Sequence, residues 1–202
     1  MGGGHRITCY EHQWSHAASA FFPSPFDRAL VLTLDGGSDM CSGMASIGEG
    51  RDLRPITVSP SPLSLGWLYS RVTELVDYVP QRDEHKTQWL SAAGTPDFLP
   101  SFRRLTEQSR QGFPVCASRF IVARQGRWTL AQDFLATLGL PPAGTPPERS
   151  HAMAIARSAQ DVVEEAVVAL AEGLRKRTDT KYLCVAGGVF LNTFVVRALE
   201  ER

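Results

Sequence analysis

The stretch Ala29–Gly37, ALVLTLDGG, decides the fold class of this 202-residue chain. Its side chains alternate between two faces of a strand, and both faces are largely apolar. A strand with two apolar faces is typical of the middle of a sheet, and the two glycines end it. Further strands are expected near residues 43–48 and 53–58, with a turn at 48–51 between them, which gives a three-stranded meander.

Helical periodicity surrounds this meander. Alanines predict a short helix at residues 11–22, which prolines then end. Apolar residues spaced by three and four predict a helix at residues 64–79. A longer helix of roughly 45 Å is expected at residues 148–177, with residues 145–148 as a capping box that has proline at the first helical position. A strand at residues 181–186 follows, and Gly-Gly separates it from a last helix.

The segment between the two longer helices carries weaker signals. Residues 80–100 are polar and broken by glycine and proline, which indicates loops. A short helix is expected near residues 102–108, a strand near 119–124 and a helix around 130–138. Residues 139–147, GLPPAGTPP, read as a linker. The chain is therefore interpreted as one domain over residues 1–202, with a first part to about 138, the linker at 139–147 and a second part from 148.

Composition narrows the function classes. The 21 basic and 21 acidic residues give no net charge, so nucleic-acid binding is not expected. No apolar run approaches the length of a membrane span, and no signal peptide is recognisable, so a cytoplasmic protein without membrane association is expected. The four cysteines are far apart and form no CxxC pair, which argues against a zinc ribbon or a redox motif.

Three residues form a candidate metal site. His12 and His16 are four apart, so on a helix both imidazoles lie on one face. Asp35 ends the first strand and adds a carboxylate. Two imidazoles and one carboxylate with open coordination positions suit Fe(II) or another divalent metal. The alternatives are ordinary surface histidines and a turn-capping aspartate.

Two Gly-Gly segments are candidate phosphate-binding turns. Gly36-Gly37 and Gly187-Gly188 each follow an apolar strand, and we expect them to face one cleft together with Asn192. Neither matches GxGxxG or a P-loop, and tight packing alone is the other interpretation. The charged run at residues 83–86, DEHK, is more typical of a solvated turn than of a site.

Taken together, several segments resemble the ASKHA-type domain of O-carbamoyltransferases, enzymes that decorate antibiotics and nodulation factors. The similar segments occur in family order over most of the chain. They are residues 12–26 and 34–36, the SLGWLYS block at 64–70 with Thr73, DEHK at 83–86, LSAAG at 90–94 and the AGGVFLN block at 186–192.

The resemblance implies an incomplete α/β fold of the ribonuclease H-like, ASKHA (actin-like ATPase) class, with a mixed β-sheet and flanking helices. It implies transfer of a carbamoyl group from ATP-derived carbamoyl-adenylate to a hydroxyl of a small-molecule acceptor. A YrdC-like domain, absent from these residues, would make the carbamoyl-adenylate. Acceptor recognition would lie in loops such as 80–115.

The same resemblance assigns site residues. The metal, typically iron, would be held by His12, His16 and Asp35. The residues assigned to carbamoyl-adenylate are Asp35, Gly36, Gly37, Gly66, Gly187, Gly188 and Asn192. Glu84 and Lys86 are acceptor or loop candidates, and no catalytic residue is assigned.

The sequence also departs from the family pattern. Gln13 stands where the family often has another histidine, and the family domain extends on both sides of these residues. We therefore expect low or no activity from this chain alone. The alternatives are a kinase or ATPase-like protein of the same superfamily, a tRNA threonylcarbamoyl-transfer enzyme and a non-catalytic remnant. The acceptor, the metal and the oligomeric state stay open.

Overall fold

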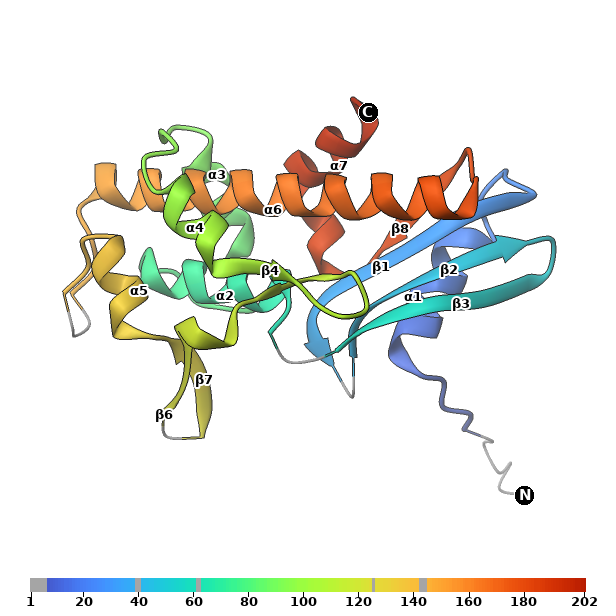
Figure 1. Ribbon diagram of the computed structural model, residues 1–202, viewed down its shortest axis with the longest axis horizontal. Helices are drawn as coiled ribbons and strands as arrows, with labels where there is room; N and C mark the ends of the chain where they lie inside the picture. Colours follow the sequence, from blue (N-terminus) through green and yellow to red (C-terminus); the bar gives the residue numbers. More distant parts are fainter. Residues whose placement is uncertain (1–6, 39–40, 61–62, 125, 142–144) are drawn as a thin grey trace, which may run out of the picture.

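The computed structural model describes residues 7–38, 41–60, 63–124, 126–141 and 145–202. A sheet occupies one end of the molecule and a group of short helices the other, and the long helix α6 (Arg149–Thr178) runs across both (Figure 1). None of the helices in these ranges is both long and apolar enough to cross a membrane.

The sheet has four strands and mixes antiparallel with parallel pairing. Its order is β3-β2-β1-β8, where β1 pairs antiparallel with β2 and parallel with β8. The strands are β1 (Arg28–Ser38), β2 (Cys41–Glu49), β3 (Asp52–Pro60) and β8 (Leu183–Ala186). The expected meander is confirmed, and so is the central place of the first strand. The expected end of that strand at the two glycines is wrong: β1 continues through Gly36 and Gly37 to Ser38, with a shift in its pairing to β2 after Leu34. The chain is thus mixed α/β, with helices on both faces of a mixed sheet.

Helix α1 (His12–Phe21) covers one face of the sheet (Figure 1). Its Ala17 and Phe21 pack with Ala29, Val31 and Met44, all at most 2% exposed. This helix is where the alanine-rich segment predicts it. Its start is fixed by Glu11, whose side chain accepts a hydrogen bond from the Trp14 N–H.

The other face of β1 carries Leu30, Leu32 and Leu34, which belong to the larger core with α2 and α6. Helix α2 (Leu65–Leu75) begins at Ser64, whose hydroxyl accepts a hydrogen bond from the Trp67 N–H. It ends four residues before the predicted end, because Asp77 takes a left-handed backbone conformation with φ of 66°.

Helix α6 confirms the predicted long helix almost residue for residue. The predicted capping box is wrong: Glu148 is the N-cap, its side chain makes no capping hydrogen bond, and both prolines precede the helix. The helix is instead stabilised by its buried stripe, in which Ile155, Ala159 and Val167 are fully buried.

The region around residues 80–141 differs most from expectation. The DEHK run is not a solvated turn: Asp83 is 5% exposed and precedes α3 (Glu84–Ser91), whose Thr87 and Ser91 are fully buried. Residues 80–115, expected as acceptor-recognising loops, also contain regular structure. It comprises α3, α4 (Leu99–Leu105), β4 (Thr106–Gln108) and β5 (Pro114–Cys116).

The remaining elements of this region were predicted only in part. The helix expected at 102–108 ends at Leu105, because residues 106–108 pair antiparallel with β5. The strand expected at 119–124 starts as a 3₁₀ turn, η1 (Ser118–Phe120), before β6 (Ile121–Arg124). The turn at residue 126 leads into β7 (Arg127–Leu130), and α5 (Gln132–Thr137) follows it.

The C-terminal segment corrects one further expectation. The helix predicted directly after Gly187-Gly188 is preceded by a 3₁₀ turn, η2 (Gly188–Leu191). Asn192 is the N-cap of α7 (Thr193–Glu200), and its Oδ1 accepts hydrogen bonds from the Phe194 and Val195 N–H groups.

Candidate metal centre and the adjoining pocket

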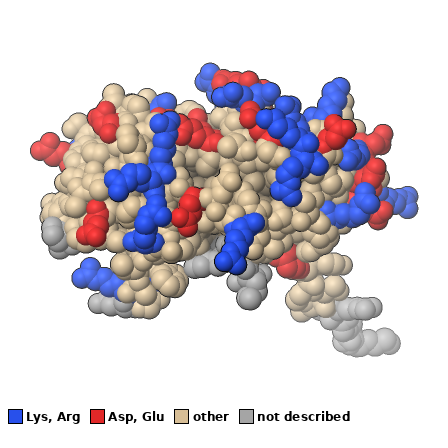
Figure 2. All heavy atoms as spheres, in the orientation of Figure 1, with Lys and Arg blue, Asp and Glu red and all other residues tan. Residues whose placement is uncertain are grey.

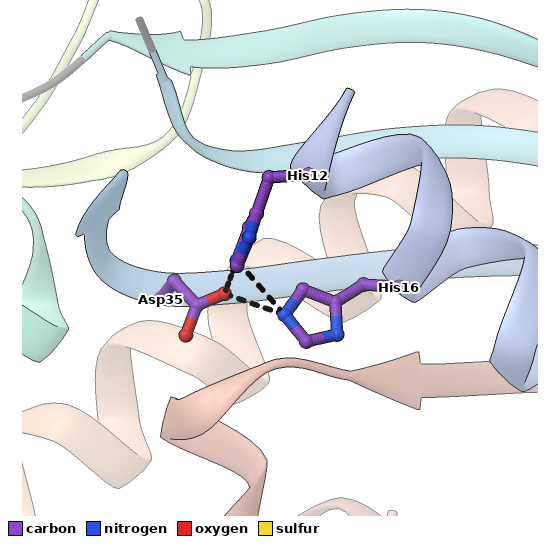
Figure 3. Close-up of side chains that lie close together, drawn as sticks. All are labelled: His12, His16 and Asp35. Carbon is purple, nitrogen blue, oxygen red and sulfur yellow. Dashed lines mark hydrogen bonds and ion pairs between the residues drawn. The ribbon is translucent and has the colours of Figure 1, made fainter. Parts of the chain in front are cut away.

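Three donor atoms converge where α1 faces the end of β1. The Nε2 atoms of His12 and His16 each lie 2.9 Å from Oδ2 of Asp35, and the two Nε2 atoms are 3.0 Å apart. Figure 3 shows both rings directed at the same carboxylate oxygen. The side chains are 39%, 32% and 17% exposed, so the cluster is open to solvent on one side.

These separations are informative about coordination. Ligand bonds of about 2.1 Å that meet at 90° place their donor atoms about 3.0 Å apart, whereas a tetrahedral angle gives about 3.4 Å. The observed spacing of 2.9–3.0 Å matches the right-angled arrangement. The three side chains could therefore hold a metal ion, and the same distances are those of hydrogen bonds among them.

Asp35 is held by contacts that come from distant parts of the chain. Its Oδ1 accepts a 2.7 Å hydrogen bond from the Gly188 N–H, and its backbone oxygen accepts a 2.9 Å bond from the Ser64 hydroxyl. One carboxylate therefore uses one oxygen toward the histidines and the other toward the glycine turn. That division fixes the orientation of Asp35.

Two glycines allow the backbones to come this close. A Cβ on Gly66 would lie 2.6 Å from the Gly36 nitrogen, and a Cβ on Gly187 would overlap the Leu34 carbonyl oxygen. Gly187 also has φ of 101°, which other residues rarely adopt. Because these two glycines have no side chain, the ends of β1, α2 and β8 can pack closely against one another.

Gln13, at the place where the family often has a further histidine, does not join the cluster. It is fully buried against the sheet, and its Oε1 accepts a 2.5 Å hydrogen bond from the Thr33 hydroxyl. Its Nε2 has no hydrogen-bond partner among the described residues. Because Gln13 faces the sheet, the departure from the family pattern leaves the three donor atoms unaffected.

A pocket of about 430 Å³ adjoins Asp35 on the Gly188 side. Six of the residues singled out in the sequence line it, namely Asp35, Gly36, Gly66, Glu84, Gly188 and Asn192. Gly187 packs against Leu34 instead, and Lys86 pairs with Asp83 at 3.1 Å. Of Gly37, the structure describes only its place in β1. Gly36 of β1 and Gly188, in the turn after β8, thus meet at this pocket.

Sequence reasoning missed several polar residues of the pocket wall. Tyr69 and Ser70 come from α2, and Gln88 from α3. Ser70 donates a 2.7 Å hydrogen bond to Oε1 of Glu84, which also accepts from the Gln81 N–H. The SLGWLYS block carried a signal for Ser70, but nothing local marked Gln88, since α3 itself was not predicted.

Comparison with known proteins agrees with the resemblance. A family model described as "Carbamoyltransferase N-terminus" matches residues 4–202. An uncharacterized protein of Synechocystis sp. is 33% identical over 184 residues, which cover 90% of this chain and 30% of that protein. The nodulation protein NolNO of Sinorhizobium fredii is 30% identical over 191 residues, with 93% and 26% covered.

A further relative is the nodulation protein NolO of Bradyrhizobium diazoefficiens, 31% identical over 183 residues, with 90% of this chain and 31% of that protein covered. The chain therefore spans less than a third of the length of each of these three relatives.

Proposed function

We propose that this chain, which belongs to the carbamoyltransferase family and matches its N-terminal part, forms the site of an O-carbamoyltransferase at which the acceptor receives the carbamoyl group. In this proposal it holds carbamoyl-adenylate while the carbamoyl group passes to a hydroxyl of a small-molecule acceptor. The observation that carries the proposal is the double role of Asp35, which faces the two histidines with one oxygen and the glycine turn of the pocket with the other.

The fold supports this proposal. A meander, a helical segment and a return to a strand parallel to the first give the sheet order β3-β2-β1-β8. We assign this arrangement to the ribonuclease H-like, ASKHA class. In that class the ends of neighbouring strands and the turns after them hold nucleotide phosphates, and in our assignment Gly36 and Gly188 mark these strand ends beside the pocket.

The donor set fits a divalent metal, for which we propose Fe(II). His12, His16 and Asp35 would hold it, because two imidazoles and a carboxylate at right-angled spacing suit iron. When bound, such an ion would supply Lewis-acid polarisation of a carbamoyl or phosphate oxygen. Asp35 would then link the metal to the pocket through its hydrogen bond with Gly188.

The pocket residues divide the remaining tasks. The Gly188 N–H is taken by Asp35, so Gly36 and Gly66 provide the close, side-chain-free backbone wall beside the adenylate. Glu84, held by Ser70 and Gln81, offers a carboxylate that orients an acceptor hydroxyl. In the reaction the hydroxyl oxygen bonds to the carbamoyl carbon, the bond to the adenylate oxygen breaks, and AMP and a proton leave.

Surface charge supports a small-molecule acceptor over tRNA. On the face drawn in Figure 2, Lys and Arg are interspersed with Asp and Glu instead of forming one basic surface. This mixture agrees with the zero net charge of the chain. We assign formation of carbamoyl-adenylate to a YrdC-like domain outside these residues.

The test combines metal binding with transfer. Purified protein, loaded anaerobically with Fe(II), is incubated with carbamoyl-adenylate and a panel of aminoglycoside, cephem and oligosaccharide acceptors, alone and beside a full-length relative. We expect both proteins to bind iron and the full-length protein to form carbamoylated acceptor. His16→Ala should abolish iron binding by this chain, and the matching histidine-to-alanine change in the full-length relative should abolish both iron binding and product formation. His151→Gln is the matched control, since His151 lies on α6 and bonds the Leu138 carbonyl.

Two results would contradict the proposal. One is iron retained by His16→Ala at the wild-type level. The other is hydrolysis of Mg-ATP without any carbamoylated acceptor, which would favour a kinase-like or ATPase-like protein. Carbamoyl-derived modification of tRNA in place of the small acceptors would instead identify the tRNA-modifying alternative.

A further inference from the structure

A buried hydrogen-bond network lies behind the wall of the pocket. Its centre is Gln160 of α6, which is 1% exposed and uses both ends of its amide. Gln160 Oε1 accepts from the Tyr69 hydroxyl at 2.7 Å and from Asn192 Nδ2 at 2.8 Å. Gln160 Nε2 donates to Glu164 Oε1 at 2.7 Å and to Asn192 Oδ1 at 3.1 Å. All four hydrogen-bonding positions of this amide are therefore occupied.

The direction of every bond in the network follows from the backbone. Asn192 Oδ1 must be the oxygen, because it accepts from the Phe194 and Val195 N–H groups at the start of α7. The group of Gln160 that faces this oxygen must then be the amide nitrogen. Its oxygen consequently faces Tyr69, so the Tyr69 hydroxyl can only donate toward Gln160.

This direction determines what Tyr69 shows to the pocket. Its single hydrogen is used on Gln160, so the phenol oxygen can meet any further group only as an acceptor. One of its two lone pairs faces the Asn192 side chain, which leaves the other for a ligand of the pocket. Burial raises the pKa of the Tyr69 phenol above its ordinary value, so the hydroxyl stays protonated and keeps this role. Both Tyr69 and Asn192 line the pocket, whereas Gln160 stands behind them in the core.

We propose that Gln160 is a positioning residue that fixes the hydrogen-bond polarity of the Tyr69–Asn192 wall, so that this wall selects a ligand group that donates a hydrogen bond. This inference rests on the proposed adenylate pocket and deepens it. An adenine ring carries such a donor in its 6-amino group. Hypoxanthine carries a 6-oxo group there, which would face the Tyr69 oxygen lone pair to lone pair.

The test compares AMP with IMP, which have the same phosphate and ribose, by calorimetry on the metal-loaded protein. We expect AMP to bind about five- to tenfold more tightly than IMP, the range of one net hydrogen bond. Gln160→Met keeps the side-chain length but frees the Tyr69 hydroxyl to rotate and donate. We therefore expect this variant to bind both nucleotides with nearly equal affinity.

A second variant protects the test against misfolding. Tyr69→Phe removes only the oxygen and should also bring the AMP-to-IMP affinity ratio close to one. The matched control is Ser158→Ala, which alters another buried polar residue of α6 that bonds the Phe98 N–H outside the network. If Gln160 only stabilised the fold, Gln160→Met would weaken the binding of both nucleotides equally and leave the AMP-to-IMP affinity ratio unchanged. We expect this result for Ser158→Ala.

Each outcome bears on a separate claim. Discrimination that is abolished in Gln160→Met and Tyr69→Phe, but kept in Ser158→Ala, supports the inference. Equal binding of AMP and IMP by the wild type, or a ratio unchanged in Gln160→Met, overturns the inference while the adenylate pocket stands. Absence of any AMP binding by the wild type, with metal bound, would instead contradict the proposed function.

Discussion

The two ends of the molecule differ in how well their helices and strands are predicted from the sequence. The sheet end, made of α1, β1–β3 and β8, follows the predicted periodicities closely. The helical end, residues 80–141, holds α3, β4, β5 and β7, none of which was predicted. At the sheet end, β1 and β8 are largely apolar and short turns separate β1, β2 and β3, so the signal is local. The elements of the helical end are short and polar, and they are ordered by what they pack against.

The helical end shows how packing replaces local signal. The Thr87 hydroxyl of α3 donates to the Thr73 hydroxyl of α2 at 2.9 Å, and both residues are fully buried. Gly94 lets the chain pass directly over the Met153 carbonyl of α6. Such polar and backbone contacts define α3 without an apolar stripe. The difference teaches that a short polar helix is recognised only through its neighbours.

The largest expected effect tests whether the two ends form one cooperative unit. Phe102 of α4 is fully buried, with its ring 5.5 Å from that of Phe134, in the same core cluster as Leu30 of β1. We expect Phe102→Ala to lower the free energy of unfolding by about 3–5 kcal/mol. Urea unfolding, followed by tryptophan fluorescence and circular dichroism, measures it.

Both probes should report the same single transition if the core is shared. Phe22→Ala is the control, since Phe22 is 52% exposed and should change stability little. Two separate transitions in Phe102→Ala would show that the ends unfold independently.

The next effect isolates the metal centre at the sheet end. Asp35→Asn keeps the shape of the side chain but removes its charge from the histidine cluster. Removing a residue that only hydrogen-bonds to a metal ligand costs about 10–100-fold in metal affinity. Because Asp35 would itself be a ligand, we expect Asp35→Asn to lower the affinity by at least about 100-fold. Anaerobic titration with Fe(II) measures it, and Asp52→Asn, at the exposed start of β3, should bind like the wild type. An Asp35→Asn protein with wild-type affinity would rule out the centre.

A glycine pair separates close packing from backbone strain. Gly187 and Gly112 both have positive φ, 101° and 85°, but only a Cβ on Gly187 would meet other atoms, those of Leu34. Both substitutions place an alanine at a positive φ, but only Gly187→Ala also brings a Cβ into overlap with Leu34. We therefore expect Gly187→Ala to destabilise the protein by about 1–3 kcal/mol more than Gly112→Ala. Thermal unfolding compares the two, and equal losses would mean that the contact between β8 and β1 is not tight.

The smallest expected effect concerns a carboxylate at the helical end. Burial of Asp83 opposes its ionisation, but hydrogen bonds from Arg82, Lys86 and the Val79 N–H outweigh it and lower the pKa of Asp83 to about 2. A carboxyl with a lowered pKa stabilises the folded state above its ordinary pKa of 3.8, and this contribution is lost as the pH falls toward 2.

The corresponding measurement compares Asp83→Asn with the wild type. We expect the wild type to have the higher melting temperature at pH 6, and the difference to shrink between about pH 4 and pH 2. Asp77→Asn, outside these hydrogen bonds, is the control. A difference that stays constant over this range would show that the charge of Asp83 does not stabilise the helical end.

The sequence by itself determined the elements whose signals are local. Alternating apolar residues specified β1, the three- and four-residue spacing specified α6, and the HxxxH pair placed two imidazoles on one face of α1. The end of an apolar strand likewise marked Asp35. Each of these follows from the chemistry of neighbouring residues, so no knowledge of the rest of the fold was needed.

Only the tertiary structure decided how these parts meet. The pairing of β8 with β1 brings Gly188 within 2.7 Å of Asp35, 153 residues away in the chain. The start of α7 sets the orientation of Asn192, and through Gln160 the polarity of Tyr69. These contacts join residues that are far apart in sequence, and no local periodicity encodes such distances. They form because burying the shared core aligns the strand ends and closes the pocket between them.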